Sequence, residues 1–450
     1  MMTKKTHILI LPYPSQGHIN PMLQFAKRLA SKSDNFIFTL LLPTSQTKSM
    51  TPRIGSINVQ PISDGALEGQ NFESAEAYLR QFQSVVPGSL DELIRREFDR
   101  GDEFQPKMII YDSFLPWALD VAHGNGLDGA PFFTQFCSVS SLYFLYKEGK
   151  LSSSEPLYGL PKLEPRDLPS FIRDKESSSC LLELLVDQFS NVDQAEYVFF
   201  NTFDKLESQM VEWMSSQWPV LTVGPTIPSM YLDKYIEDDT SYGLNLFKPN
   251  RQTCQDWLSE RRSGSVIYVS FGSMAILEQD QVCEIAQCLE NLQTHFIWVV
   301  RETEMTKLPT EFVEWNLRSG LGLVVTWCNQ LDVLAHDAVG CFVTHCGWNS
   351  TLEALCFGVP MVGMPNWSDQ PTNAKFVEDV WGVGVRTMED ENGIVTGLEL
   401  EKCVRAVLEK GEKGDEIRRN AEKMKDWALK AIEIDGSSDC NIVKFVSGLT

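Results

Sequence analysis

The sequence predicts an α/β fold with two doubly wound domains. In the first half of the chain, short apolar runs rich in β-branched and aromatic residues alternate with amphipathic stretches, a pattern that predicts a parallel sheet covered by helices. The expected strands there are residues 7–11, 36–42, 108–111, 131–136 and 197–200. The pattern restarts in the second half, with expected strands at residues 266–271, 296–300, 323–326, 340–344 and 359–364.

Chain length and one aperiodic segment predict where the domains divide. A chain of 450 residues is too long for a single compact core. Residues 224–250 are rich in Pro, Ser, Tyr and acidic residues and have neither a helical nor a strand period, whereas residues 415–449 carry apolar residues at helical spacing. We therefore expect a first domain at 1–235, a linker at 236–252, a second domain at 253–430 and a terminal helix at 431–450.

Composition excludes several classes of function. The net charge of -22 argues against nucleic-acid or anionic membrane surfaces as partners. The 11 cysteines contain no CxxC pair, so neither a metal site nor a disulfide framework is expected. Pro12 and Pro14 interrupt the first apolar run, and no apolar run reaches about 18 residues, so we expect no signal peptide or membrane span. A cytoplasmic monomer is the expectation.

A histidine follows the first expected strand, at the edge where open α/β sheets bind ligands. Gly17 and His18 precede Asn20 and Pro21, which are typical of a helix N-cap and of the first helical position. His18 is therefore expected at the loop-helix junction, facing the cleft. The alternative is a surface or capping histidine.

A carboxylate follows another strand of the same sheet. Asp112 comes directly after the expected strand at 107–111, so it should lie at the same edge as His18. A hydrogen bond from one imidazole nitrogen to Asp112 would fix the tautomer and leave the other nitrogen to accept a proton. The alternative is that Asp112 caps a helix beginning near Pro116.

An anion site is expected in the second domain. Ser273 lies in a Gly-Ser turn after a strand, and Gly347, Asn349 and Ser350 lead from another strand into a helix. The free N-H groups of that helix terminus, with the polar side chains, can hold a diphosphate. Ser350 and Glu353 also fit an S-x-x-E capping box, which is a purely structural alternative for both.

Two further pairs of residues suit the rest of a nucleotide sugar. Trp327 and Gln330 follow the strand at 323–326, and a planar base could stack on the Trp327 ring. Asp369 and Gln370 combine a carboxylate with an amide, which suits the vicinal hydroxyls of a hexose. The alternative is that these are ordinary solvated polar groups.

Taken together, the segment 327–370 resembles the signature box of the plant family 1 UDP-sugar glycosyltransferases. The match consists of W-C-N-Q from Trp327, H-C-G-W-N-S from His345, then Glu353 and the pair Asp369-Gln370. The similarity extends over the whole chain and includes Gly17-His18 and the residues around Asp112.

The resemblance implies the GT-B architecture, in which two Rossmann-like domains face a cleft. The first domain would bind the acceptor and the second the UDP-sugar, and the terminal helix would pack back on the first. His18 would be the general base, oriented by Asp112. The implied donor site is Trp327 on the uracil; Gln330 and Glu353 on the ribose; Ser273, His345, Asn349 and Ser350 on the diphosphate; Trp348, Asp369 and Gln370 on the sugar; with Gly17, Cys328 and Gly347 beside them.

The resemblance also implies the reaction. In this family the acceptor oxygen attacks the anomeric carbon directly and inverts it, without a metal or a covalent intermediate. Gln370 is typical of glucose-preferring members, so UDP-glucose is the expected donor. The acceptor would be a small lipophilic plant metabolite, among phenolics, carboxylic acids, terpenoids and steroids. Tyr13, Phe114, Phe136 and Tyr143 are candidate acceptor walls, although aromatic residues after strands also commonly belong to the core.

Two other functions remain compatible with the residues. Glu353 and Asp369 could be the carboxylate pair of a glycoside hydrolase. A sugar-nucleotide-binding protein without transferase activity would need only the donor site. The first alternative leaves the stacking Trp327 and the phosphate turn unexplained, and the second leaves His18 and Asp112 without a role.

Overall fold

The chain divides into two compact units. A computed structural model describes residues 5–47, 51–66, 75–99, 101, 105–151, 158–174, 179–237, 239–243 and 251–449. Unit 1 consists of Met1–Leu160, Asp174–Leu244 and Lys430–Thr450, and unit 2 of Pro161–Arg173 and Asn245–Leu429. The division after Leu244 falls inside the expected linker, of which residues 238 and 244–250 lie outside the described residues. One segment differs from expectation, because residues 161–173 belong to unit 2.

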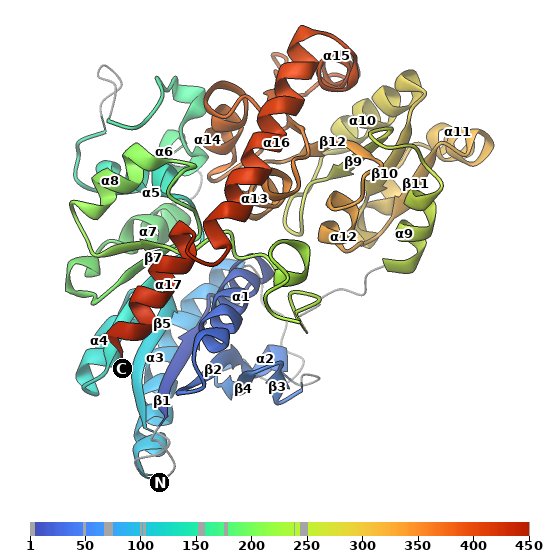
Figure 1. Ribbon diagram of the computed structural model, residues 1–450. Coiled ribbons are helices and arrows are strands. Elements are labelled where there is room, and N and C mark those ends of the chain that lie inside the picture. The colour runs from blue at the N-terminus through green and yellow to red at the C-terminus, as the bar shows by residue number, and fades with distance from the viewer. Residues whose placement is uncertain are drawn as a thin grey trace. The chain divides into compact units, whose positions relative to one another are not determined.

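Unit 1 contains an eight-stranded sheet in the order β3-β4-β2-β1-β5-β6-β7-β8 (Figure 1). Neighbouring strands are parallel except β3 and β4, which are antiparallel. All five expected strands are confirmed, and β3, β4 and β8 are additional. The strands are β1 (Thr6–Leu11), β2 (Phe36–Pro43), β3 (Arg53–Ile54), β4 (Ile57–Ile62), β5 (Pro106–Asp112), β6 (Asp128–Phe133), β7 (Val198–Phe200) and β8 (Val220–Thr222).

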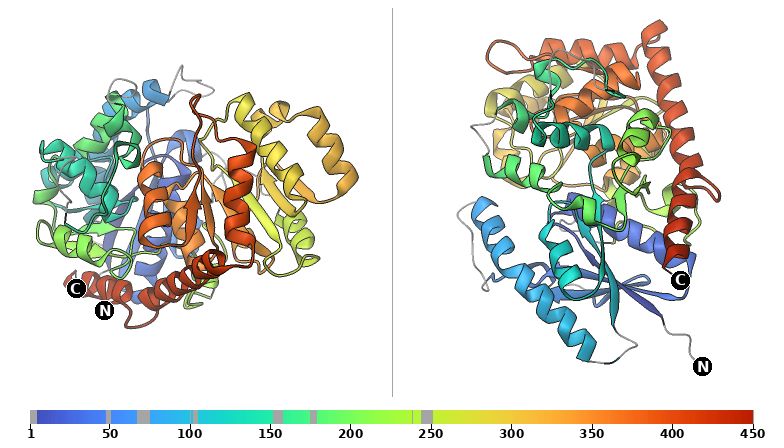
Figure 2. Two further views of the ribbon diagram at one scale, coloured as in Figure 1. Left: turned by 90° about the horizontal axis from the view of Figure 1, so that it is seen from above. Right: turned by 90° about the vertical axis from the view of Figure 1, so that its left-hand side faces the viewer.

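Helices cover both faces of this sheet. α1 and α17 lie side by side against one face of the sheet (Figures 1 and 2). Ile8, Ile10, Met22 and Phe445 share one core there. α3 and α4 pack on each other and on β5. The helices of unit 1 are α1 (Gln16–Lys32), α2 (Thr44–Thr47), α3 (Ala75–Asp99), α4 (Trp117–Gly124), α5 (Cys137–Lys147), α7 (Ser179–Asp187), α8 (Ser208–Ser215) and α17 (Ser437–Gly448).

The start of α1 differs from the sequence-based expectation. The N-cap is Ser15, so Asn20 and Pro21 lie inside the helix rather than at its beginning. Ile19 is 1% exposed and packs on the sheet with the rest of the apolar face. Burial of Ile19 in this first turn outweighs the local Asn-Pro signal, because helix stability in proteins comes more from tertiary packing than from propensity.

Unit 2 contains a parallel six-stranded sheet in the order β11-β10-β9-β12-β13-β14 (Figure 1). The five expected strands are again confirmed, and β14 is additional. The strands are β9 (Val266–Ser270), β10 (His295–Val299), β11 (Gly322–Val325), β12 (Val339–Thr344), β13 (Met361–Gly363) and β14 (Gly384–Arg386). Strand order reverses between β9 and β12, as it does between β1 and β5 in unit 1. Ligand crevices in open α/β sheets lie at such reversals, outside the carboxyl ends of the strands.

The helices of unit 2 complete a second doubly wound layer structure around a core that includes Ile267, Val269, Trp298 and Val343. None of the helices within the described residues is long and apolar enough to cross a membrane. The helices are α6 (Ser170–Arg173), α9 (Arg251–Ser259), α10 (Gln279–Leu292), α11 (Thr310–Ser319), α12 (Gln330–Leu334), α13 (Trp348–Phe357), α14 (Gln370–Lys375), α15 (Gly397–Leu408) and α16 (Glu412–Ile432), the last ending in unit 1.

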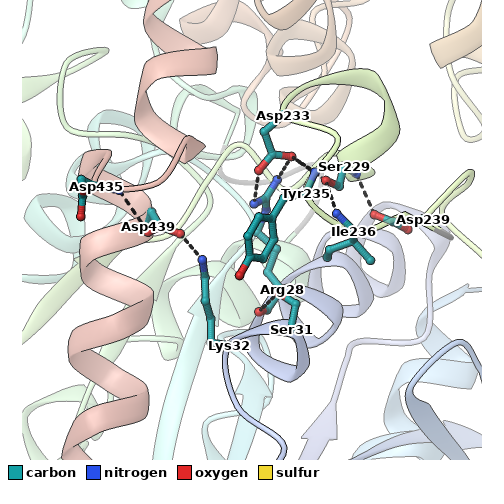
Figure 3. A network of polar contacts seen from close by, with 10 residues as sticks. All are labelled: Arg28, Ser31, Lys32, Ser229, Asp233, Tyr235, Ile236, Asp239, Asp435 and Asp439. Carbon is teal, nitrogen blue, oxygen red and sulfur yellow. Dashed lines mark hydrogen bonds and ion pairs between the residues drawn. The ribbon is translucent and has the colours of Figure 1, made fainter.

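The polar side of α1 carries a network of buried ion pairs (Figure 3). Arg28 donates two hydrogen bonds to Asp233, at 2.7 and 2.8 Å, and Lys27 donates to Asp239 at 2.7 Å. Lys32, on the next turn, pairs with α17 through Asp439. These contacts tie two distant parts of unit 1, the segment around residues 229–243 and the C-terminal helix, to the helix that begins at the His18 turn.

Candidate active site

The predicted contact between His18 and Asp112 is present at the β1/β5 reversal of unit 1. His18 lies in the first turn of α1, and its Nδ1 is 2.7 Å from Oδ2 of Asp112, the last residue of β5. Asp112 is 0% exposed, and its other oxygen accepts a hydrogen bond from the backbone N-H of Phe114 at 3.0 Å. A carboxylate oxygen can only accept, so Nδ1 carries a proton, and in the neutral tautomer that this contact favours Nε2 has the lone pair.

The helix-capping alternative for Asp112 is wrong. α4 begins at Trp117, its N-cap is Pro116, and the Asp112 side chain instead closes a local turn at Phe114 and meets His18. The Thr134 hydroxyl lies 3.3 Å from the same Nδ1, at the end of β6. His18 follows β1, Asp112 ends β5 and Thr134 follows β6. Residues at the ends of three neighbouring strands therefore meet at the Nδ1 atom of His18.

Two of the four aromatic candidates surround this histidine. The ring centroids of Tyr13 and Phe114 lie 5.1 and 4.8 Å from that of His18. Burial, followed by the charge of Asp112, raises the pKa of Tyr13 to about 12, so its phenol stays protonated and does not compete as a base. Phe136 and Tyr143 are 0% exposed. The expectation that those two line an acceptor pocket is wrong, because both are core residues.

In unit 2, His345 lies at the β9/β12 reversal, wedged between two glycines. A Cβ on Gly272 would lie 2.9 Å from the imidazole, and one on Gly347 would lie 2.5 Å from it. Gly272 and Cys346 both have left-handed backbones, with φ of 73° and 59°. The imidazole therefore depends on two positions without side chains and on one strained residue, a combination that is common at functional sites.

His345 is a neutral group at physiological pH. Burial lowers its pKa to about 4, and its Nδ1 has no hydrogen-bond partner among the described residues. Because the ring carries no net charge, it can meet an anionic ligand only as a hydrogen-bond donor or acceptor. Ser273, which follows Gly272, is partly exposed beside it.

The helix that follows His345 begins earlier than the capping-box alternative requires. α13 starts at Trp348 with Gly347 as N-cap, so Ser350 already lies in the first turn and does not cap the helix. The N-H groups of Trp348, Asn349 and Ser350 are those of the first turn, which point out of the helix. Trp348 is 4% exposed, and its ring packs near that of Trp381, with 6.2 Å between centroids.

Gln330 and Glu353 are hydrogen-bonded to each other. The Gln330 amide nitrogen donates to Glu353 at 2.7 Å and to the Ser350 hydroxyl at 2.9 Å. Its oxygen accepts from the Tyr268 hydroxyl at 3.1 Å. Both amide hydrogens are thereby used, so the side chain of Gln330 holds Glu353 and Ser350 in place, whereas Glu353 presents the carboxylate.

Trp327 and Cys328 have different environments. Trp327 is partly exposed after β11, as a ring that stacks a base would be. Cys328 is 6% exposed, and its sulfur lies 3.3 Å from the Tyr268 hydroxyl. The thiol of Cys328 therefore belongs to the support behind Gln330 rather than to the ligand-facing surface.

Asp369 and Gln370 lie at the start of α14. Asn373, one turn on, donates to Asp369 at 2.6 Å and to the backbone oxygen of Cys346 at 2.8 Å. The Gln370 oxygen accepts from the backbone N-H groups of Asn366 and Trp367 at 2.9 and 3.1 Å, which leaves its amide nitrogen as the group to meet a ligand. Asn373 thus joins the expected hexose pair to the His345 turn.

Several supporting residues were not predicted. Tyr268 and Asn373 support named site residues, and only Asn373 had a local signal, its one-turn spacing from Asp369 on a helix. Arg301, after β10, donates to the backbone oxygens of Ser273, at 2.9 Å, and Ala275. No sequence pattern near Arg301 indicated that it holds the turn containing Ser273.

Replacing Arg301 by methionine is expected to raise KM for the UDP-sugar about tenfold with a smaller effect on kcat, because the Ser273 turn loses two charge-assisted hydrogen bonds. Initial rates at varied donor concentration measure this. Arg318→Met, an exposed arginine of α11, is the matched control. An unchanged KM in Arg301→Met would contradict the supporting role.

The chain is similar to known proteins over almost its whole length. A family model described as UDP-glucuronosyl and UDP-glucosyl transferase matches residues 190–432. The chain is 46% identical to UDP-glycosyltransferase 74E2 of Arabidopsis thaliana, covering 99% of both chains, and 44% identical to an Arabidopsis flavonol 7-O-beta-glucosyltransferase, again with 99% of both. The crystal structure of Os79 from O. sativa in complex with UDP superposes with a TM-score of 0.91 at 36% identity, covering 98% of this chain and 100% of that one.

Proposed function

The chain belongs to the plant family 1 UDP-glycosyltransferases, enzymes of GT-B fold that transfer a sugar from a UDP-sugar, and on this premise we propose that its donor is UDP-glucose. The acceptor is a hydroxyl or carboxyl group of a small lipophilic metabolite, among phenolics, carboxylic acids, terpenoids and steroids. The product is a β-glucoside or a glucose ester, formed with inversion at the anomeric carbon.

The observation that carries the proposed transfer reaction is the hydrogen bond between His18 and Asp112. It leaves Nε2 as a base with a defined lone pair. Nε2 takes the proton from the acceptor hydroxyl as the acceptor oxygen bonds to the anomeric carbon, while the bond from that carbon to the diphosphate oxygen breaks and UDP leaves. Asp112 stabilises the imidazolium that forms.

The geometry of unit 2 supports a donor site with direct and supporting residues. Trp327 stacks on the uracil and Glu353 accepts hydrogen bonds from the ribose hydroxyls, held by Gln330. The diphosphate lies at the N-terminus of α13, against Ser273, His345, Asn349 and Ser350, where the helix dipole favours negative charge. Asp369 and the amide nitrogen of Gln370 bind the hexose, with the backbone of Trp348.

Glucose is the proposed sugar for two reasons. Gln370 closes the donor segment, which is typical of glucose-preferring members of the family. The name of the Arabidopsis relative that is 44% identical states a β-glucosyltransferase acting on a flavonol hydroxyl. Both favour glucose as the sugar, and the name of the relative also states a β linkage.

The hydrolase alternative fits the geometry less well. A glycoside hydrolase needs one protonated carboxylic acid beside one carboxylate. Glu353 and Asp369 each accept a hydrogen bond from an amide nitrogen, that of Gln330 or Asn373. Each carboxylate also has its own supporting amide, which suits ligand binding more than proton donation.

The proposal is tested by incubating the purified full-length protein with UDP-glucose and a panel of phenols, carboxylic acids, triterpenes and steroids. Mass spectrometry and NMR of the products should identify at least one β-glucoside or glucose ester. If no acceptor gives product above a control without protein, the transferase proposal is overturned. If UDP-galactose is used better than UDP-glucose, the proposed donor is wrong.

A further inference from the structure

Residues 161–173, here called the arm, are an excursion of the first half of the chain into unit 2. The flanking stretches, Met1–Leu160 and Asp174–Leu244, both belong to unit 1. The arm contains a short 3₁₀ helix, Pro165–Asp167, and the one-turn α6. Both pack together, and the 3₁₀ helix packs on α14, the helix that begins with Gln370.

Ser170 of the arm holds the loop that carries the hexose-binding pair. Its backbone N-H donates to the backbone oxygen of Ser368 at 2.8 Å, and its hydroxyl accepts from the Ser368 backbone N-H at 2.7 Å. Phe171 packs edge-on against Trp367, with centroids 5.6 Å apart. The arm therefore satisfies both backbone groups of Ser368, the residue immediately before Asp369, and packs against the side chain of Trp367.

The backbone conformation of the loop makes this support important. Ser368 has a left-handed backbone with φ of 58°, which a residue with a side chain adopts at a cost of about 1 to 3 kcal/mol unless its surroundings hold it. The Gln370 side chain holds Asn366 and Trp367 from one side, and Ser170 holds Ser368 from the other. Asp369 follows at once, so its direction depends on Ser368.

A buried ion cluster fixes the arm itself. Asp167 is 1% exposed, and Arg386 of β14 donates to its carboxylate at 2.6 Å, while Lys375 of α14 lies 3.6 Å away. The hydroxyl of Thr372 donates to the Asp167 backbone oxygen at 2.6 Å. Two of these three partners belong to α14, so the arm is anchored to the helix whose first residue is Gln370.

We propose that the arm positions the hexose-binding loop and that Ser170 determines how well the site distinguishes one UDP-hexose from another. This rests on the proposed role of Asp369 and Gln370 as hexose ligands. Ser170 is a positioning residue: it acts through the backbone of Ser368 and through the direction this gives Asp369. The uracil, ribose and diphosphate contacts lie on other loops, so we expect Ser170 to affect them much less than it affects the hexose contacts.

The test compares the effect of a substitution on the use of UDP-glucose with its effect on the binding of UDP alone. Ser170→Ala removes the hydroxyl acceptor but keeps the backbone bond, and it is expected to raise KM for UDP-glucose about five- to tenfold. The Kd for UDP, measured by calorimetry, should stay within about twofold of the unchanged protein. The ratio of kcat/KM for UDP-glucose to that for UDP-galactose should fall, an effect that a general loss of stability would not produce.

Two variants keep the proposal falsifiable. Ser170→Thr retains the hydroxyl and should restore donor discrimination, and Lys162→Ala, at an exposed arm position, should behave as the unchanged protein. Asp369→Asn serves as the reference for a direct hexose contact. If Asp369→Asn weakens UDP-glucose binding and Ser170→Ala does not, the positioning role is overturned and the proposed function stands. If neither does, the hexose assignment fails and the positioning role with it.

Discussion

Replacing His18 by alanine is expected to lower kcat for transfer to an alcohol or phenol by about 10²- to 10⁴-fold, the contribution of a positioned general base. The donor site lies on other residues, so the Kd for UDP should be unchanged. A carboxylic acid acceptor is already ionised near neutral pH, so the loss should be much smaller there. Comparing the same variant on a phenol and on a carboxylic acid therefore reports which acceptor needs the base.

Asp112→Asn tests the partner of that histidine. An amide can donate to Nδ1, which would favour the tautomer with its proton on Nε2 and remove the lone pair that accepts the acceptor proton. A loss approaching that of His18→Ala is expected on alcohol acceptors. His123→Ala is the control, because His123 is a half-exposed histidine paired with Glu196 at 3.3 Å. Full activity of Asp112→Asn on an alcohol would refute the orienting role.

Replacing Arg28 by methionine is expected to destabilise the protein by about 3 to 5 kcal/mol, because it leaves Asp233 buried without its partner. The two side chains are 6% and 7% exposed, and their contact is bidentate. Urea denaturation of the full chain at pH 7 measures the loss. The double variant Arg28→Met/Asp233→Leu should recover much of it, since an apolar pair of similar size replaces the buried charges.

The matched control is an exposed pair. Arg95 and Asp91 lie 3.1 Å apart with side chains 72% and 35% exposed, so Arg95→Met should cost less than about 1 kcal/mol. An equal loss in both arginine variants would show that burial of the Arg28 pair is unimportant.

Acid should reduce the difference between the unchanged protein and Arg28→Met. Burial alone would raise the pKa of Asp233, but the hydrogen bonds and charge of Arg28, with a hydrogen bond from Ser229, outweigh it and hold the pKa below its usual 3.8. Because the folded pKa is the lower one, the stabilisation is present above about pH 4 and is lost as pH falls through the folded pKa. Denaturation repeated at decreasing pH checks this.

Much of the fold followed from sequence because long apolar strands such as Phe36–Pro43 and Val339–Thr344 carry a clear pattern. Strands of two or three residues, such as Arg53–Ile54 and Gly384–Arg386, are too short to show a period. The start of α1 was misplaced because Asn20 and Pro21 give a local signal that burial of Ile19 overrides. Local signals locate elements well and their ends poorly.

The site was partly predictable for a related reason. His18 and Asp112 each follow a strand, and the topology of parallel sheets brings such residues together. The sequence could not indicate which residues support other site residues. Gln330, for example, donates its amide hydrogens to Glu353 and Ser350. Nor could it indicate that Trp348 is buried. Arg301 and Ser170 act through backbone atoms of loops distant in sequence, and no residue spacing encodes such contacts.

The arm also constrains how such enzymes can exchange parts. The chain passes between the two units at four points, after Leu160, Arg173, Leu244 and Leu429. A chimera of two relatives joined near residue 245 would combine the arm of one parent with the Ser368 loop of the other. To transfer sugar preference from one parent to the other, recombination would therefore have to exchange two separate gene segments. One encodes only residues 161–173, and the other encodes the Ser368 loop.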